Sequence, residues 1–149
     1  MISLSKTVLK EIYEKDYYLW LVQTLELVKN RNANELDWEH LTEEIEALGN
    51  EQRRKVKSYL RQLLIHLLLY RYWETEKTYS GRGWLEEISN FRYELQLLLE
   101  SGTLYNYFLK NLDEVYIKAR KRAIQKTKLS PSVFPEKCPF NLEEILKDD

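Results

Sequence analysis

The stretch that decides the fold is Leu63-Leu64-Ile65-His66-Leu67-Leu68-Leu69. Apolar residues at helical spacing continue on both sides of this run and form one stripe along the helix. The other apolar residues of the run cover the remaining faces of the helix. A helix that is apolar on all sides is normally buried at the centre of a domain. Charges flank the run well short of the roughly 20 apolar residues of a membrane span. The sequence therefore predicts a central core helix from about Glu51 into the seventies, with the stripe Val56, Leu60, Leu63, Leu67 and Tyr70.

Two helices are predicted before this central one. The first covers about residues 9–28, and the second is a short helix that Asp37 caps, because an aspartate carboxylate can accept the free amide protons of a first turn. Gly49 is read as its end and Asn50 as the start of the central helix. The residues suited to the buried faces are Tyr13, Tyr17, Trp20, Leu21, Thr24 and Val28 in the first helix, and Trp38, Leu41, Ile45 and Leu48 in the second.

Two long helices and a tail are predicted after it. Gly81-Arg82-Gly83 is read as a break, followed by helices over about 84–99 and 104–126. Three prolines then forbid a continuous helix, while Asn141 with Glu144 indicates a capping box at the start of a short final helix. The predicted fold is all-α: one domain over 1–149, a bundle of about five helices, with a loose N-terminus over 1–12 and a proline-containing tail over 129–149 packed on the bundle.

The composition of the chain argues against several classes of protein. The 149 residues include 23 basic and 24 acidic side chains, a formal net charge of -1, whereas a dedicated nucleic-acid binder is usually strongly basic. Cys138 is the only cysteine, so one chain forms no intramolecular disulfide and no multi-cysteine zinc site. The first residues lack the apolar core of a signal peptide. We expect a cytoplasmic protein with no membrane association.

Three polar residues fall close to the predicted core. Glu44 lies at the edge of its apolar stripe, His66 lies inside the apolar run, and Arg92 lies within the apolar arc of its helix. A buried guanidinium needs partners, because an unpaired charge in the core costs several kcal/mol. We therefore expect Arg92 to pair with Glu44 or Asp37, with His66 beside them. Such a cluster is either an acid/base or anion-binding site or a polar network that fixes helix packing, and the packing network is the simpler interpretation.

Several known site types do not fit the spacing. Di-iron bundles need two Glu-x-x-His pairs, and neither His40 nor His66 follows a glutamate at that distance. Glu43-Glu44-Ile45-Glu46 puts the third glutamate in the wrong place for a Glu-Glu-x-x-Glu magnesium helix. Phosphate loops, nucleophile elbows and zinc motifs are also missing. No metal and no cofactor is predicted.

Basic side chains are patterned even though the total charge cancels. Arg53, Arg54, Lys55, Lys57 and Arg61 lie close together, and Lys110, Lys118 and Lys121 fall on the outer face of the predicted helix over 104–126. Basic stripes beside exposed aromatic residues fit single-stranded nucleic acid or an acidic partner, whereas an ordinary solvated helix face is the simpler interpretation.

Three segments together resemble a known family: 13–21, 36–49 and 64–68, which contain the Asp37-Trp38 to Leu48-Gly49 block and the Leu64-Ile65-His66 run. The chain resembles the domain of unknown function twenty-nine family from about Tyr13 to Leu146. The resemblance implies a single all-α bundle with no established activity. It also places five residues of the expected polar cluster on positions that look like the family motif: Asp37, Glu44, His66, Trp84 and Arg92.

The sequence thus favours a binding or assembly module without catalysis, with an unidentified protein or a second copy as partner. The alternative is an enzyme acting on a small molecule or phosphoester, in which Glu44 is a base or ligand, His66 an acid/base and Arg92 an anion clamp. The second alternative is a nucleic-acid-associated protein that uses Lys110, Lys118 and Lys121. Neither the ligand nor the oligomeric state is identified by the sequence.

Overall fold

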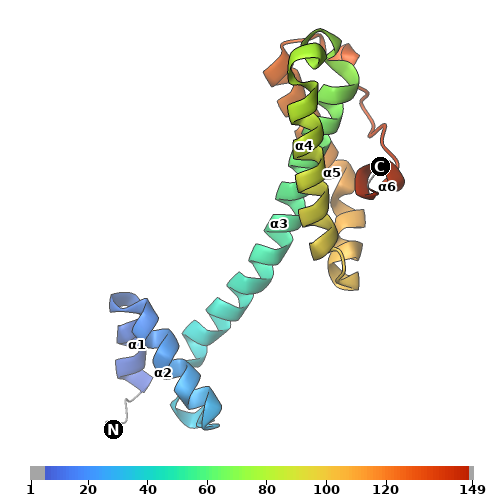
Figure 1. The fold of residues 1–149 in the computed structure, drawn as a ribbon. Helices are drawn as coiled ribbons and strands as arrows, with labels where there is room; N and C mark the ends of the chain where they lie inside the picture. Colours follow the sequence, from blue (N-terminus) through green and yellow to red (C-terminus); the bar gives the residue numbers. More distant parts are fainter. Residues whose placement is uncertain (1–5, 148–149) are drawn as a thin grey trace. The chain divides into compact units, whose positions relative to one another are not determined.

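The computed structural model describes residues 6–147, and its regular elements over this range are all helices (Figure 1). This confirms the predicted all-α class. None of the helices in this range combines the length and apolar character needed to cross a membrane. The elements are α1 Lys6–Lys15, α2 Tyr17–Lys29, the 3-10 turn η1 Ala33–Glu35, α3 Trp38–Tyr72, α4 Glu74–Leu98, α5 Gly102–Thr127, the 3-10 turn η2 Pro131–Val133 and α6 Leu142–Leu146.

The chain divides into two compact units, residues 1–50 and residues 51–149, here called unit 1 and unit 2. Helix α3 begins in unit 1 and continues along the chain into unit 2. The single domain expected over 1–149 stays a prediction, and each unit is described by itself below.

In unit 1, the predicted helix over 9–28 is two helices. The break comes at Asp16, whose side chain accepts a hydrogen bond from the Leu19 amide at 3.0 Å and so caps α2. A carboxylate in this position satisfies an amide that would otherwise lack a partner, which favours a new helix start over continuation. The expected loose N-terminus over 1–12 also differs, since α1 begins at Lys6 and Leu9 is fully buried. Residues 1–5 of that stretch lie outside the described range.

Two predicted glycine breaks are wrong. Helix α3 continues through Gly49 and Asn50, and α4 continues through Gly81-Arg82-Gly83. A glycine inside a helix costs only about 1 kcal/mol relative to alanine, and the surrounding turns supply hydrogen bonds that outweigh it. The actual break between these helices comes at Trp73, which precedes the first residue of α4.

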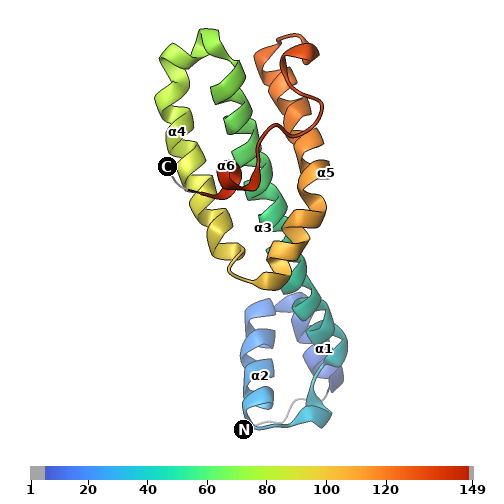
Figure 2. The ribbon, with the colours of Figure 1, turned by 90° about the vertical axis from the view of Figure 1, so that its right-hand side faces the viewer.

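In unit 2, the later part of α3 lies alongside α4 and α5 (Figure 2). In the predicted central stripe, Val56, Leu60 and Leu63 are fully buried, and Leu67 and Tyr70 are partly buried against the core. The tail contributes three further buried side chains to the same core: Phe134, Phe140 and Ile145.

Polar side chains also hold this tail in place. Arg120 donates to the main-chain oxygens of Phe134 and Pro131, at 3.1 and 2.8 Å. The predicted capping box is present, with Asn141 and Glu144 each bonding the other's main-chain amide. These contacts explain why a segment with three prolines is ordered.

Candidate functional site

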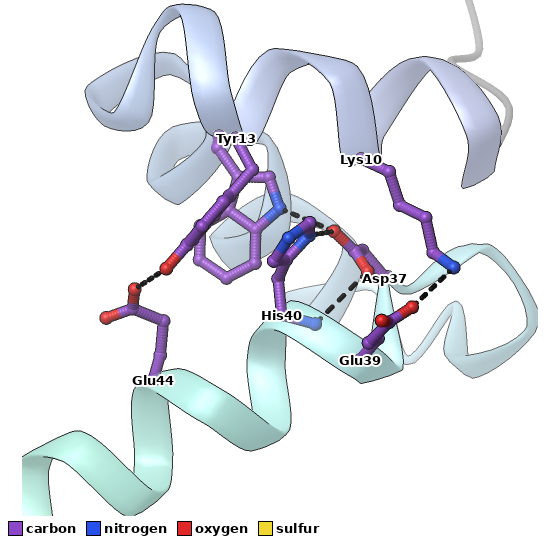
Figure 3. A network of polar contacts seen from close by, with 7 residues as sticks. Lys10, Tyr13, Asp37, Glu39, His40 and Glu44 are labelled. Atoms are coloured by element: carbon purple, nitrogen blue, oxygen red, sulfur yellow. Dashed lines mark hydrogen bonds and ion pairs between the residues drawn. The ribbon is translucent and has the colours of Figure 1, made fainter.

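The best-defined polar site in unit 1 is built on Asp37, which directly precedes α3 (Figure 3). Its side chain is almost fully buried. Oδ2 lies 2.5 Å from Nδ1 of His40 and accepts a hydrogen bond from Nε1 of Trp20 at 3.2 Å. Oδ1 accepts from the His40 amide at 3.3 Å, which is the capping role predicted for Asp37. Both oxygens of the buried carboxylate are therefore satisfied.

These hydrogen bonds keep Asp37 ionised. Burial by itself would raise the pKa of Asp37, because a desolvated carboxylate favours its neutral form. The hydrogen bonds from His40 and Trp20 favour the anion and outweigh that effect, so the pKa of Asp37 is lowered. Unit 1 thus holds a charged group in its interior, stabilised by donors from α2 and α3.

A second carboxylate extends the network toward α1. The phenol groups of Tyr13 and Tyr17 each donate to one oxygen of Glu44, both at 2.6 Å. These bonds lower the pKa of Glu44, and the bond to Glu44 raises the pKa of Tyr13 to about 12. The Tyr13 ring also stacks on His40, with ring centroids 3.8 Å apart and planes 14° apart. The network therefore ties α1, α2 and the start of α3 together.

A surface ion pair closes the network on its other side. Nζ of Lys10 lies 2.9 Å from Oε2 of Glu39, which again joins α1 to α3 (Figure 3). Both side chains are exposed, so this pair contributes little to stability.

The network pairs an imidazole with a buried carboxylate. Asp37 orients the His40 ring, as carboxylates do for histidines that act as bases or ligands. Among the described residues, however, no group of three or more histidine, cysteine, aspartate or glutamate side chains gathers as a metal ion would require. The contacts that the network does make join helices to one another, and this is the arrangement of a packing network.

Sequence reasoning assigned two members of the network, Asp37 and Glu44, to a polar cluster. It placed Tyr13, Tyr17 and Trp20 on a buried helix face without a polar role, and it missed Lys10, Glu39 and His40. One signal was available for His40. An aspartate three residues before a histidine at a helix start places both on the same first turn.

The expected pairing of Arg92 with Glu44 or Asp37 stays a prediction, because Arg92 lies in unit 2 and the two carboxylates lie in unit 1. Arg92 is buried in unit 2, as predicted, but its Nε donates to the main-chain oxygen of Ile145 at 3.0 Å and its Nη2 to that of Glu144 at 2.7 Å. These oxygens belong to the last turn of α6, where main-chain carbonyls lack helical partners and carry partial negative charge. The end of a short helix thus supplies main-chain acceptors to the buried guanidinium.

The two other expected cluster members also have partners within unit 2. His66 is half-buried, and its Nδ1 lies 2.7 Å from the main-chain oxygen of Gln62 in the preceding turn. Trp84 stacks on Trp73 with ring centroids 5.7 Å apart. The enzyme alternative, which needs Glu44 of unit 1 together with His66 and Arg92 of unit 2, stays a prediction.

Comparison with known proteins bears on the whole chain. The family model described as Domain of unknown function DUF29 matches residues 12–149. The chain belongs to the DUF29 family. Neither the curated proteins nor the solved structures yield a match. The family match covers nearly all of both units, which confirms the resemblance and adds no activity to it.

Unit 1 of this DUF29 chain also carries an apolar surface that the sequence assigned to the interior. Two rows of side chains, one on α2 and one on α3, follow the same 3-4-3 spacing, and we call them the apolar seams. Seven of these eight side chains are 40–75% exposed, and Leu41 is half-buried. The α2 seam is Tyr18, Leu21, Leu25 and Val28, and the α3 seam is Trp38, Leu41, Ile45 and Leu48.

The inward orientation expected for the α3 stripe, and for Leu21 and Val28, is therefore wrong. Helix α2 instead buries Trp20 and Thr24. A groove of about 520 Å³ connects the two seams, since its lining includes Val28, Trp38 and Ile45. The groove thus brings the Val28 end of the α2 seam beside the α3 seam.

Proposed function

We propose that this DUF29 chain is a binding and assembly module that associates with a second copy through the apolar seams of unit 1. The observation that carries the proposal is the exposure of both seams on one small helical unit. A surface of this kind usually marks an interaction site, because monomeric proteins rarely expose contiguous apolar patches larger than a few hundred Å². Catalysis has no part in this role, and a cytoplasmic location belongs to the same proposal.

The spacing of the seams specifies a helical partner. Residues at 3-4-3 intervals occupy the a and d positions of a heptad, which is the pattern by which helices pack at small crossing angles. Two such helices present half of a four-helix bundle. A second pair of helices with the same pattern would complete it.

The size of the surface is that of a stable interface. From their exposed fractions, the seam side chains together with Val22 expose on the order of 900 Å², close to the roughly 800 Å² per partner of standard protein interfaces. Only part of the gain from burying this area appears as affinity, because association also costs translational and side-chain freedom.

Symmetry favours a second copy as the occupant. The two seams have equal length and equal spacing. A two-fold axis between two copies would therefore place each seam of one copy against an apolar row of the same length and spacing in the other. Charges beside the seams carry both signs, with Lys29 and Glu26 on α2 and Glu46 on α3. A lysine of one copy can thus face a glutamate of the other at the rim.

The test is the oligomeric state of seam variants. We expect the full chain to sediment as a dimer with a micromolar or tighter Kd. Leu25→Glu and Ile45→Glu should each weaken the dimer by about 100-fold or more, because each would bury an unpaired carboxylate in the interface. Sedimentation equilibrium over about 1–100 μM protein, the useful range for such affinities, measures the dissociation constant.

Matched controls exist in unit 2. Leu97 and Leu109 are 47% and 42% exposed and lie outside the seams. Leu97→Glu and Leu109→Glu should leave the dimer intact, and circular dichroism should show native helix content in all four variants. A wild-type monomer throughout the concentration range would refute the proposal. A dimer insensitive to both seam variants would refute it equally.

A further inference from the structure

The last third of α5 concentrates positive charge. Six basic residues fall within 118–128, while no acidic residue occurs between 115 and 135. The total charge of -1 does not show this concentration of positive charge, because the two units have opposite formal charges. Unit 1 has 5 basic and 10 acidic residues, a formal charge of -5. Unit 2 has 18 basic and 14 acidic residues, a formal charge of +4. The six are Lys118, Arg120, Lys121, Arg122, Lys126 and Lys128.

Five of these side chains are exposed together. Arg120 is engaged with the tail, as described above, whereas the other five are solvent-exposed and are here called the α5 basic patch. Val115, Ala119 and Ala123 of the same helix are buried in the core of unit 2. Nζ of Lys118 lies 3.7 Å from Oε1 of Glu114.

We propose that the α5 basic patch binds the phosphate backbone of duplex nucleic acid, an activity separate from assembly through unit 1. A uniform array of cations suits a uniformly charged polymer, since neutralising phosphates releases condensed counterions. Residues three and four apart on a helix are surface neighbours, so 118, 121, 122 and 126 share one face.

Other anionic partners fit this surface less well. A protein interface normally has an apolar centre inside a polar rim, whereas the only exposed apolar side chain on this part of α5 is Ile117. A membrane-bound helix inserts an apolar face between lipids, and here that face packs in the protein core. Single strands are usually held by stacking on aromatic rings, and Tyr116, the aromatic residue within 115–128, is buried.

The expected binding is electrostatic and sensitive to salt. Five phosphate contacts give a slope of about -4.5 for log K against log salt concentration, which corresponds to a loss of about 500-fold between 50 and 200 mM salt. This slope is the one expected for a single α5 basic patch in contact with the duplex. Fluorescence anisotropy of a labelled random-sequence DNA duplex, titrated with the full chain, measures both the affinity and the slope.

A charge-matched pair of variants makes the test specific. The patch variant Lys121→Gln, Arg122→Gln and Lys126→Gln should retain two contacts and lower the slope to about -1.8. The control variant Lys55→Gln, Arg82→Gln and Lys147→Gln removes the same charge from exposed positions elsewhere in unit 2 and should keep most of the slope.

Three outcomes would overturn the inference. The first is no duplex binding at 50 mM salt, a concentration at which non-specific binding is strong. The second is an equal loss of slope in the control and patch variants, which would show a general effect of net charge. The third is tighter binding to phosphatidylserine vesicles than to the duplex, which would make a lipid surface the partner.

Discussion

Among single residues, Asp37 should have the largest effect on the stability of unit 1. Its buried carboxylate accepts hydrogen bonds from Trp20 and His40, and Asp37→Ala would leave these donors without their acceptor. We expect a loss of about 3 kcal/mol in the free energy of unfolding at neutral pH, in line with breaking a buried charged pair. Urea denaturation followed by circular dichroism measures this loss.

The pH dependence of the same variant identifies the cause. The pKa of Asp37 is lowered on folding, so its contribution is present above the unfolded value of 3.8 and is lost as the pH falls through the lower folded value. The stability difference between wild type and Asp37→Ala should therefore shrink in acid. The exposed Glu43→Ala on the same helix should change stability by less than about 0.5 kcal/mol. A difference that is unchanged or larger at pH 3 would contradict the role given to the carboxylate.

At the scale of an element, the continuity of α3 makes Gly49 a sensitive position. A methyl group added there meets no atom within 4 Å, and the glycine does not have a positive φ. Gly49→Ala should therefore stabilise the protein by about 0.5–1 kcal/mol, because alanine loses less backbone freedom in a helix. Thermal unfolding measures the gain as a higher Tm.

Gly81 provides the matched comparison. An added methyl group would lie 3.3 Å from Cγ of Lys77, so part of the same gain would be lost to crowding. If Gly49 instead ended a helix in the left-handed conformation, as the sequence suggested, Gly49→Ala would lower the Tm. The sign of the change thus separates the two conformations.

The elements show what sequence patterns could and could not predict. The central stripe and the Asn141 capping box were correct, because each depends on residues a few positions apart along one helix. The helix breaks were harder to predict. Glycine at position 49 costs only about 1 kcal/mol of helix stability, which the hydrogen bonds of a long helix outweigh. Asp16, in contrast, caps α2 with no glycine or proline nearby to signal a break. For Arg92, burial was predictable but the partner was not, because main-chain oxygens at a helix end have no sequence signature.

At the scale of the whole molecule, the sequence did not predict which faces of α2 and of the start of α3 are exposed. Periodicity identifies an apolar face but does not say which neighbour covers it. In unit 1 the aromatic and polar residues of α1 and α2 pack around Asp37 and Glu44, which leaves the apolar seams on the outside. The assembly proposed above supplies the missing neighbour from a second copy.

This arrangement predicts that the two units respond differently to protein concentration. If a second copy covers the seams, the α2 amides exchange after the dimer dissociates. The monomer fraction of a tight dimer falls as the square root of concentration, so amide exchange in α2 should slow by up to about tenfold between about 1 and 100 μM protein. Exchange in α4, which lies in unit 2, should not change. Hydrogen–deuterium exchange with mass spectrometry resolves both segments in one sample.

The Leu25→Glu variant tests the origin of this response, since it keeps the network around Asp37 but blocks the apolar contact. Its α2 amides should exchange at one rate across the concentration range, equal to the dilute wild-type rate. Protection of α2 that is high in wild type already at 1 μM and independent of concentration would mean that the seams are covered within one chain. That result would exclude a second copy as the partner that covers the seams. The polar network around Asp37 would be unaffected, because it depends only on contacts inside unit 1.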